Sequence, residues 1–242
     1  MAMPAIRSLA RQAQAAGLAL LLAGWCGAPA RAQDAPPRLF GSIEFIGGSL
    51  EALPQWTRVL RRIRAEKAVY EVCDRGDGNR DIGKCPYSSV AAWRDTVRAL
   101  KGRPPREQLD AINKFLNRWI YRLDQENFNV EDYWASPLEF LERSGDCEDY
   151  AIIKYVSLKA LGFPVGKLRI VVVEDTVRRL SHAVLAVYVD GDILIMDSLF
   201  DGVLSHKQVT FYKPYYSVNE TTRWAHLALM KPRLRTPGGV SR

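Results

Sequence analysis

Hydrophobic positions divide the chain into two parts that meet near Gly162. In the first part, apolar side chains recur every three or four positions, which predicts amphipathic helices. The periodic segments cover residues 55–70, 89–101 and 109–119. A further short helix begins at Ser136-Pro137-Leu138-Glu139, where a capping box coincides with proline at the first helical position, and it is expected to end near residue 145.

The most apolar helical segment runs from Tyr150 to Leu161, where nine of twelve positions are apolar. This pattern predicts a helix buried on nearly all sides, ended by Gly162 and Pro164. Beyond it, short runs of alternating or continuous apolar residues predict β-strands. The expected strands cover residues 168–174, 182–189, 193–196, 212–217 and 224–230, with a short one at 42–46.

The order of these elements predicts the fold class. Asp190-Gly191-Asp192 is a strong hairpin signal, so the strands on either side of it are expected to pair antiparallel. Helices followed by an antiparallel sheet predict an α+β fold in which the buried helix packs on the sheet. Neither an internal repeat nor a linker divides residues 33–232, which we expect to form one domain, followed by a disordered tail at 233–242.

Residues 1–32 have the pattern of a signal peptide and are set aside from the fold. Two arginines precede an apolar run at 16–23, and a small-x-small cleavage site ends at Ala32. The mature protein is therefore expected to be exported. Cys26 also follows the apolar run, as in lipoproteins, but the bulky Trp25 before it disfavours lipidation.

Charge and cysteine content narrow the range of partners. The chain carries a net charge of +7, and residues 1–32 contain three arginines and no acid, so their removal leaves +4. This excess is mild and scattered, so no nucleic-acid partner is expected. Cys73 and Cys85 flank a loop rich in glycine and aspartate, and in an exported protein they are expected to form a disulfide. Cys147 then remains as the free thiol.

Cys147 lies at the start of the central helix. Unpaired backbone N–H groups and the helix dipole favour a thiolate there, so we expect the thiol pKa to lie below its ordinary value of about 8.5. His182 opens one strand and Asp197 ends the next, so a hairpin would bring their side chains together. These residues predict a thiol hydrolase with Cys147 as nucleophile, His182 as base and Asp197 as the residue that orients the imidazole.

Three acids surround this cysteine: Asp146, Glu148 and Asp149. Acids in the first turn of a helix are ordinary partners of the helix dipole. Next to a thiolate, however, they oppose its formation by like charge. A bound hard cation would resolve this conflict, and Ca²⁺ accepts several carboxylate oxygens. The hypothesis that follows is a calcium site formed by these three acids.

Several motifs carry a resemblance to a known family. They are Asp-Tyr-Trp-Ala-Ser-Pro-Leu-Glu at 132–139, Gly-Asp-Cys-Glu-Asp-Tyr-Ala at 145–151, Ser-His-Ala-Val at 181–184, and Asp197. Over roughly residues 45–230, the chain closely resembles the bacterial transglutaminase-like cysteine proteinases. Ser144 departs from the glycine expected in many relatives at the start of the turn before Cys147.

The resemblance implies a papain/transglutaminase-like fold, a Cys147, His182 and Asp197 triad, and dependence on Ca²⁺ bound by the acids beside the cysteine. It also implies a periplasmic endopeptidase that cuts a large surface adhesin near its N-terminus and so promotes biofilm dispersal. Control by the periplasmic domain of an inner-membrane cyclic-di-GMP receptor would follow. Two alternatives stay open: transglutaminase-type acyl transfer to an amine, and a non-catalytic binding module of the same fold.

Overall fold

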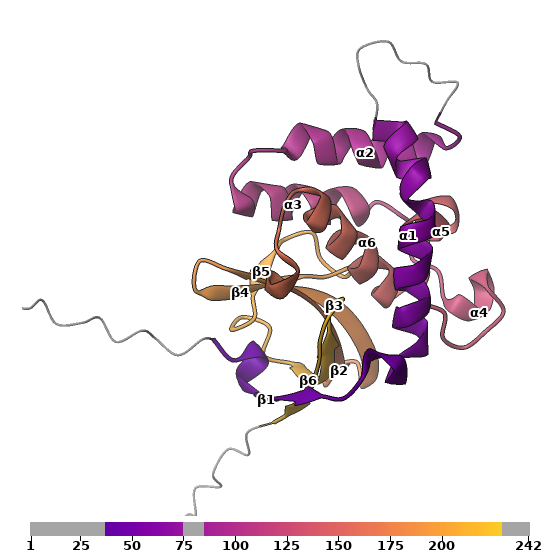
Figure 1. Ribbon diagram of the computed structural model, residues 1–242. Helices are drawn as coiled ribbons and strands as arrows, with labels where there is room; N and C mark the ends of the chain where they lie inside the picture. Colours follow the sequence, from indigo (N-terminus) through magenta and orange to yellow (C-terminus); the bar gives the residue numbers. More distant parts are fainter. Residues whose placement is uncertain (1–36, 75–84, 229–242) are drawn as a thin grey trace, which may run out of the picture. The chain divides into compact units, whose positions relative to one another are not determined.

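The computed structural model describes residues 37–74 and 85–228. The expected signal peptide (1–32) and the expected tail (233–242) lie outside the described residues. Apart from the short strand β1 (Ile43–Gly47), helices come first and the strands of one antiparallel sheet follow. The predicted α+β class is confirmed (Figure 1).

The expected helices are present, and one additional turn of helix, α4, was not predicted. Their bounds are α1 (Pro54–Asp74), α2 (Ser88–Leu100), α3 (Pro105–Leu116), α4 (Asp124–Asn127), α5 (Pro137–Arg143) and α6 (Cys147–Ala160). The capping box at the start of α5 is present: Ser136 Oγ accepts the Glu139 N–H, and the Glu139 carboxylate accepts the Ser136 N–H. Helix α3 ends earlier than expected, because the chain tightens into i→i+3 hydrogen bonds as far as Trp119.

The sheet has seven strands in the order β1-β7-β6-β2-β3-β4-β5. The remaining bounds are β2 (Leu168–Asp175), β3 (Leu180–Val189), β4 (Asp192–Met196), β5 (Leu204–Ser205), β6 (Tyr212–Val218) and β7 (Arg223–Leu227). The hairpin between β3 and β4 has the expected register, with Val189 opposite Asp192 and Leu185 opposite Met196. Asp190 and Gly191 both have positive φ in its two-residue turn, as this type of hairpin requires.

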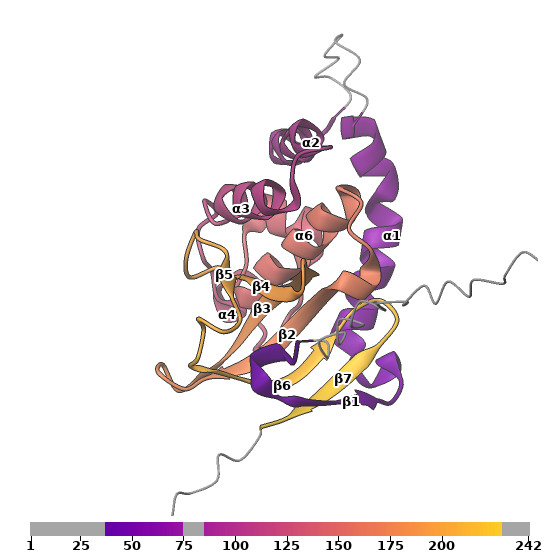
Figure 2. The ribbon, with the colours of Figure 1, turned by 90° about the vertical axis from the view of Figure 1, so that its left-hand side faces the viewer.

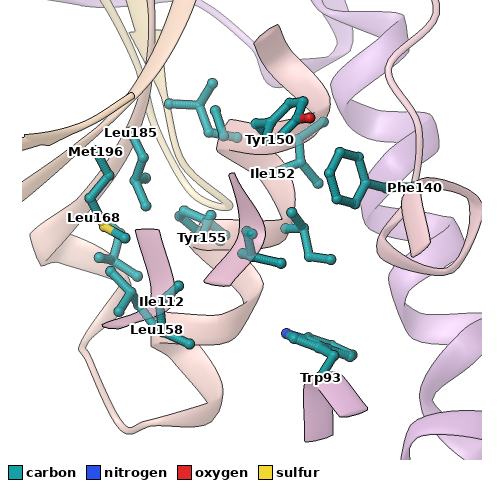
Figure 3. Close-up of a cluster of buried hydrophobic side chains, with 14 of the residues drawn as sticks. Trp93, Ile112, Phe140, Tyr150, Ile152, Tyr155, Leu158, Leu168, Leu185 and Met196 are labelled. Atoms are coloured by element: carbon teal, nitrogen blue, oxygen red, sulfur yellow. The ribbon is translucent and has the colours of Figure 1, made fainter. Parts of the chain in front are cut away.

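Helix α6 lies between the other helices and the sheet, as its sequence predicted. Figures 1 and 2 show α2, α3 and α6 on the same side of the sheet, with α6 against it. Figure 3 shows α6 side chains such as Ile152, Tyr155 and Leu158 meeting side chains of the sheet and of the neighbouring helices. Burial of this apolar cluster fixes the direction of α6, and therefore the position of Cys147 at its first residue.

A second, smaller apolar cluster covers the opposite face of the sheet. It joins Leu39 at the 3₁₀ turn η1 (Leu39–Gly41) to alternate side chains of β2, β3 and β4, and to Tyr212 at the start of β6.

A disulfide connects Cys73 near the end of α1 to Cys85 before α2. None of the described helices is long and apolar enough to span a membrane.

Candidate active site

The turn that leads into Cys147 is closely constrained. Ser144 has φ +69°, a left-handed conformation that favours glycine, and its hydroxyl donates a hydrogen bond to the Ile120 carbonyl. A Cβ on Gly145 would lie 2.0 Å from Asp149 Oδ2, so only glycine fits at this position. The turn therefore combines backbone strain with a close side-chain approach, both of which are common at functional sites.

A neighbouring segment holds this turn from outside. The Arg122 N–H donates to the Gly145 carbonyl at 2.9 Å, and Tyr121 forms a parallel bridge with Gly145. The Tyr121 ring also stacks on the Tyr150 ring of α6, with 6.2 Å between the centroids. These contacts fix the backbone just before Cys147 relative to the helix that it begins.

His182 and Asp197 form a buried hydrogen-bonded pair. His182 Nε2 lies 2.8 Å from Asp197 Oδ1, and both side chains are almost fully buried. Asp197 Oδ1 also accepts the Leu199 N–H at 3.0 Å, and Asp197 Oδ2 accepts the Tyr212 hydroxyl at 2.6 Å. The structure thus brings together two of the residues that the sequence predicted, and it adds Tyr212, which the sequence did not indicate.

Those contacts keep the Asp197 carboxylate ionised. Burial acts to raise its pKa, but hydrogen bonds from His182, Tyr212 and the Leu199 N–H outweigh burial and lower the pKa below its ordinary value. An ionised Asp197 can only accept the hydrogen bond, so Nε2 of His182 is the donor and carries the proton of the neutral ring. Nδ1 is then the nitrogen of His182 that is available to accept a proton.

The Cys147 thiol lies among acids, and its predicted low pKa is wrong for the protein without a cation. Burial raises the thiol pKa well above its ordinary value, and the charges of Glu148 and Asp146 raise it further. Sγ donates a hydrogen bond to Glu148 Oε2 at 3.2 Å. A hydrogen bond from the Ala183 N–H, directly after His182, acts in the opposite direction and is too weak to prevail.

Carboxylates from three segments meet beside Cys147. Their oxygen atoms lie within 4.8 Å of one another in overlapping groups, which include Asp146 and Glu148 with the thiol, Asp124 with Asp146 and Asp149, and Asp124 with Asp132 and Glu148. Asp124 and Asp132 were not assigned from the sequence. Asp132 was visible only as part of the Asp-Tyr-Trp motif, and no pattern marked Asp124, which belongs to the unpredicted helix α4.

These carboxylates are crowded enough to favour their protonated forms. Burial raises the pKa of Asp124 to about 6, and burial together with Asp146 raises the pKa of Glu148 to about 10. Burial also raises the pKa of Asp146. One oxygen of Asp124 and one of Asp146 are buried without a hydrogen-bond partner among the described residues. Buried acceptors without partners, in a group of acids, fit the ligand set of a hard cation.

Asp149 has a different position from the other acids. Its Oδ1 accepts the Ala135 N–H at 2.5 Å, and its Oδ2 accepts the Asp146 N–H at 3.1 Å. The carboxylate therefore caps α6 and ties the Asp-Tyr-Trp segment to the helix start. Both oxygens already accept hydrogen bonds, so Asp149 is placed to orient the cluster.

The Asp-Tyr-Trp segment is attached to α1 as well. The Arg58 guanidinium donates to the Trp134 carbonyl and to the Tyr133 hydroxyl, and it lies 4.0 Å from the centre of the Tyr133 ring. Gln55 Nε2 donates to Asp132 Oδ2 at 3.0 Å. These contacts hold Asp132 close to Glu148 in the first turn of α6.

The chain was compared with known proteins. Residues 84–231 match the family model of the bacterial transglutaminase-like cysteine proteinases. Among solved structures, Legionella pneumophila LapG is 33% identical, with a TM-score of 0.55 over 65% of this chain and 87% of that protein. A comparison with curated proteins gives no match.

Two further structures of the same Legionella protein are similar to this chain. The calcium-bound form is 33% identical, with a TM-score of 0.55 over 66% of this chain and 86% of that one. The EGTA-treated form is 32% identical, with a TM-score of 0.56 over the same shares. The family match covers more than half of the sequence. The chain therefore belongs to the bacterial transglutaminase-like cysteine proteinases, which confirms the resemblance seen in its motifs.

Proposed function

We propose that this member of the family is a calcium-dependent cysteine endopeptidase with Cys147, His182 and Asp197 as its catalytic residues. The observation that carries the proposal is the buried His182–Asp197 hydrogen bond on a hairpin whose strand β3 packs against α6, so that the backbone of Ala183, the residue after His182, acts to lower the pKa of Cys147. This packing places the base-bearing strand next to the start of α6. Membership of a proteinase family supports hydrolysis as the reaction.

In the proposed reaction, His182 Nδ1 accepts the Cys147 proton, and the thiolate attacks the carbonyl carbon of the peptide bond. The backbone N–H of Cys147 is a donor for the developing oxyanion. The imidazolium then protonates the amine that leaves, which forms a thioester on the sulfur. Water, deprotonated by His182, hydrolyses the thioester and restores the thiol.

We assign the calcium ligands to Asp146 and Glu148, as the sequence suggested, together with Asp124 and Asp132. The unpartnered oxygens of Asp124 and Asp146 support this ligand set. Asp149 orients these ligands through its hydrogen bonds to the backbone. A bound Ca²⁺ supplies positive charge that offsets these carboxylates and so favours the thiolate form of Cys147.

The substrate and its control follow from the family resemblance. We propose that the enzyme acts in the periplasm on a large repeat adhesin, which it cuts near the N-terminus, and that this cut releases the adhesin and promotes biofilm dispersal. We further propose that the periplasmic domain of an inner-membrane cyclic-di-GMP receptor restrains the enzyme. Hydrolysis of a peptide bond at this site would account for the cut and the release of the adhesin.

The test uses cells of the source organism that lack this gene. Purified protein is added with calcium or with EGTA, and new protein N-termini and released high-mass proteins are identified by mass spectrometry. We expect one dominant new N-terminus in a large surface protein, seen with calcium only and absent with Cys147→Ala. Incorporation of a labelled amine in place of a free new terminus would instead show acyl transfer. Equal release by Cys147→Ala would show a binding module.

A further inference from the structure

Lys154 is a buried cation that the proposed reaction does not use. It lies on α6 seven residues after Cys147, which is two helical turns along the same face. Its side chain is fully buried, and burial lowers its pKa to about 7, against the opposing effect of Asp197 and Asp201. The Tyr150 ring also faces it, with Nζ 5.6 Å from the ring centre. A buried lysine is costly unless it has a structural or functional partner.

The partner of Lys154 is Asn117, the residue directly after α3. Lys154 Nζ donates to Asn117 Oδ1 at 2.8 Å. The amide nitrogen of Asn117 is turned toward the loop after β4, where it donates to the Asp197 carbonyl at 3.0 Å and to the Phe200 carbonyl at 3.1 Å. It also lies 3.3 Å from Asp201 Oδ1. Lys154 therefore fixes the orientation of an amide whose other end holds the peptide of Asp197.

From this chain of contacts we propose that Lys154 and Asn117 are positioning residues, which couple the helix that carries Cys147 to the loop that carries Asp197. The proposal rests on the proposed function, because it assigns a role relative to the same three catalytic residues. The two halves of the site lie on different elements, α6 and the β3–β4 hairpin. Lys154 and Asn117 join those elements directly behind the site.

A second asparagine shows why Asn117 is distinctive. Asn113, one turn earlier on α3, donates to the carbonyls of Phe200 and Asp201 at 3.0 and 2.9 Å. The loop is therefore anchored to α3 even without Asn117. Asn117 adds the contact to Asp197 itself, and it is the asparagine of this pair that Lys154 contacts. Loss of Asn117 should thus move the catalytic carboxylate while the loop stays attached.

The experiment compares Lys154→Met, Asn117→Leu and the double variant with the wild type. Each purified protein is treated with iodoacetamide from pH 5 to 9 in saturating calcium, and labelling of Cys147 is followed by mass spectrometry. Ser157→Ala is the matched control, because Ser157 is equally buried on α6 but bonds to Trp93, away from the site. Thermal unfolding shows that each variant is folded, and Asn117→Leu keeps the test decisive if Lys154→Met does not fold.

We expect labelling at pH 6 to fall about tenfold in both single variants, because a displaced Asp197 orients His182 less well. The double variant should be no slower than Asn117→Leu, since the two residues act in series, and Ser157→Ala should match the wild type. Wild-type rates in Asn117→Leu, with slower labelling in Lys154→Met alone, would show that only the charge of Lys154 acts on the thiol and would overturn the proposal. Equal labelling rates of Cys147 in the wild type and in His182→Ala would instead overturn the proposed function.

Discussion

The two sides of the active site differ in how completely their polar groups are satisfied. On the hairpin side, the Asp197 carboxylate accepts hydrogen bonds from His182, Tyr212 and the Leu199 N–H. On the helix side, acids crowd around Cys147, and Asp124 and Asp146 each keep a buried oxygen without a partner among the described residues. The hairpin side is organised by hydrogen bonds alone, whereas on the helix side the acids are held toward their protonated forms and keep buried oxygens without partners.

This difference shows that geometry and charge can be supplied separately. The hairpin register and the contacts of Asp197 hold the imidazole in place without a bound cation. The thiol, in contrast, has a raised pKa that the helix start by itself does not correct. A site built in this way can be complete in shape yet inactive until a cation binds, which would make calcium a control point as well as a ligand.

The largest effect should come from a substitution at His182 on the hairpin side. His182→Ala removes the base, so we expect peptide hydrolysis to fall by about 10³-fold or more. His206→Ala is the matched control, since His206 is also buried but bonds to the Phe40 N–H outside the site. Rates of substrate cleavage at saturating calcium test this. Loss of activity in both variants, with both folded, would show that the effect is not specific to the imidazole of His182.

The next largest effect should come from a substitution among the acids on the helix side. Asp124→Asn keeps the shape of the side chain and an acceptor for the Tyr133 N–H, but it removes one negative charge. We expect calcium affinity to fall 10- to 100-fold, measured by calorimetry and not by activity. Asp110→Asn, a change at a half-exposed position on α3 away from the acids, is the control. Unchanged affinity in Asp124→Asn would remove this residue from the proposed ligand set.

The sequence predicted the residues of the hairpin side better than the acid cluster of the helix side, for a physical reason. His182 and Asp197 are placed by a hairpin, whose turn and strand register can be read from local sequence. The capping box before α5 and the burial of α6 are likewise local or periodic signals. Such features depend on residues close together in the chain, so the pattern alone contains them.

The acid cluster depends on contacts that no local pattern encodes. Asp124 lies in a single helical turn, too short for any periodicity, and it reaches Asp146 through the fold of the intervening chain. The hydrogen bond from the Ala135 N–H to Asp149 is likewise a contact between separate segments that no local pattern encodes. Lys154 is a third case: its place in an apolar helix is visible in the sequence, but its partner Asn117 is not.

A smaller effect should appear in the pH dependence of stability. The pKa of Asp124 is raised to about 6 and that of Glu148 to about 10, both above their unfolded values near 4. In metal-free protein, the stabilisation from these protonated groups is present at low pH and is lost as pH rises through the raised values. Calcium binds the ionised forms, so the calcium-induced rise in Tm should grow between pH 5 and pH 8.

At 100 times its Kd, calcium would add about 2.7 kcal/mol, or roughly 5–10 °C in Tm, for a protein of this size. Thermal unfolding with metal-free and calcium-saturated protein at each pH measures this increment. An increment that is equal at pH 5 and pH 8 would mean that calcium displaces no protons. The acids of the helix side would then be ionised before the cation binds.

The smallest effect should come from the loss of a single hydrogen bond on the hairpin side. Tyr212→Phe removes the hydroxyl that donates to Asp197 Oδ2 and leaves the ring and its packing in place. A hydrogen bond to a charged group is worth about 1.5–3 kcal/mol, but His182 and the Leu199 N–H still hold Asp197, so we expect a three- to tenfold loss in kcat with KM unchanged. Calcium affinity should not change, because Tyr212 belongs to the side opposite the acids. A Tyr212→Phe variant with weaker calcium binding would show that the two sides are coupled, and that the separation of geometry from charge is incomplete.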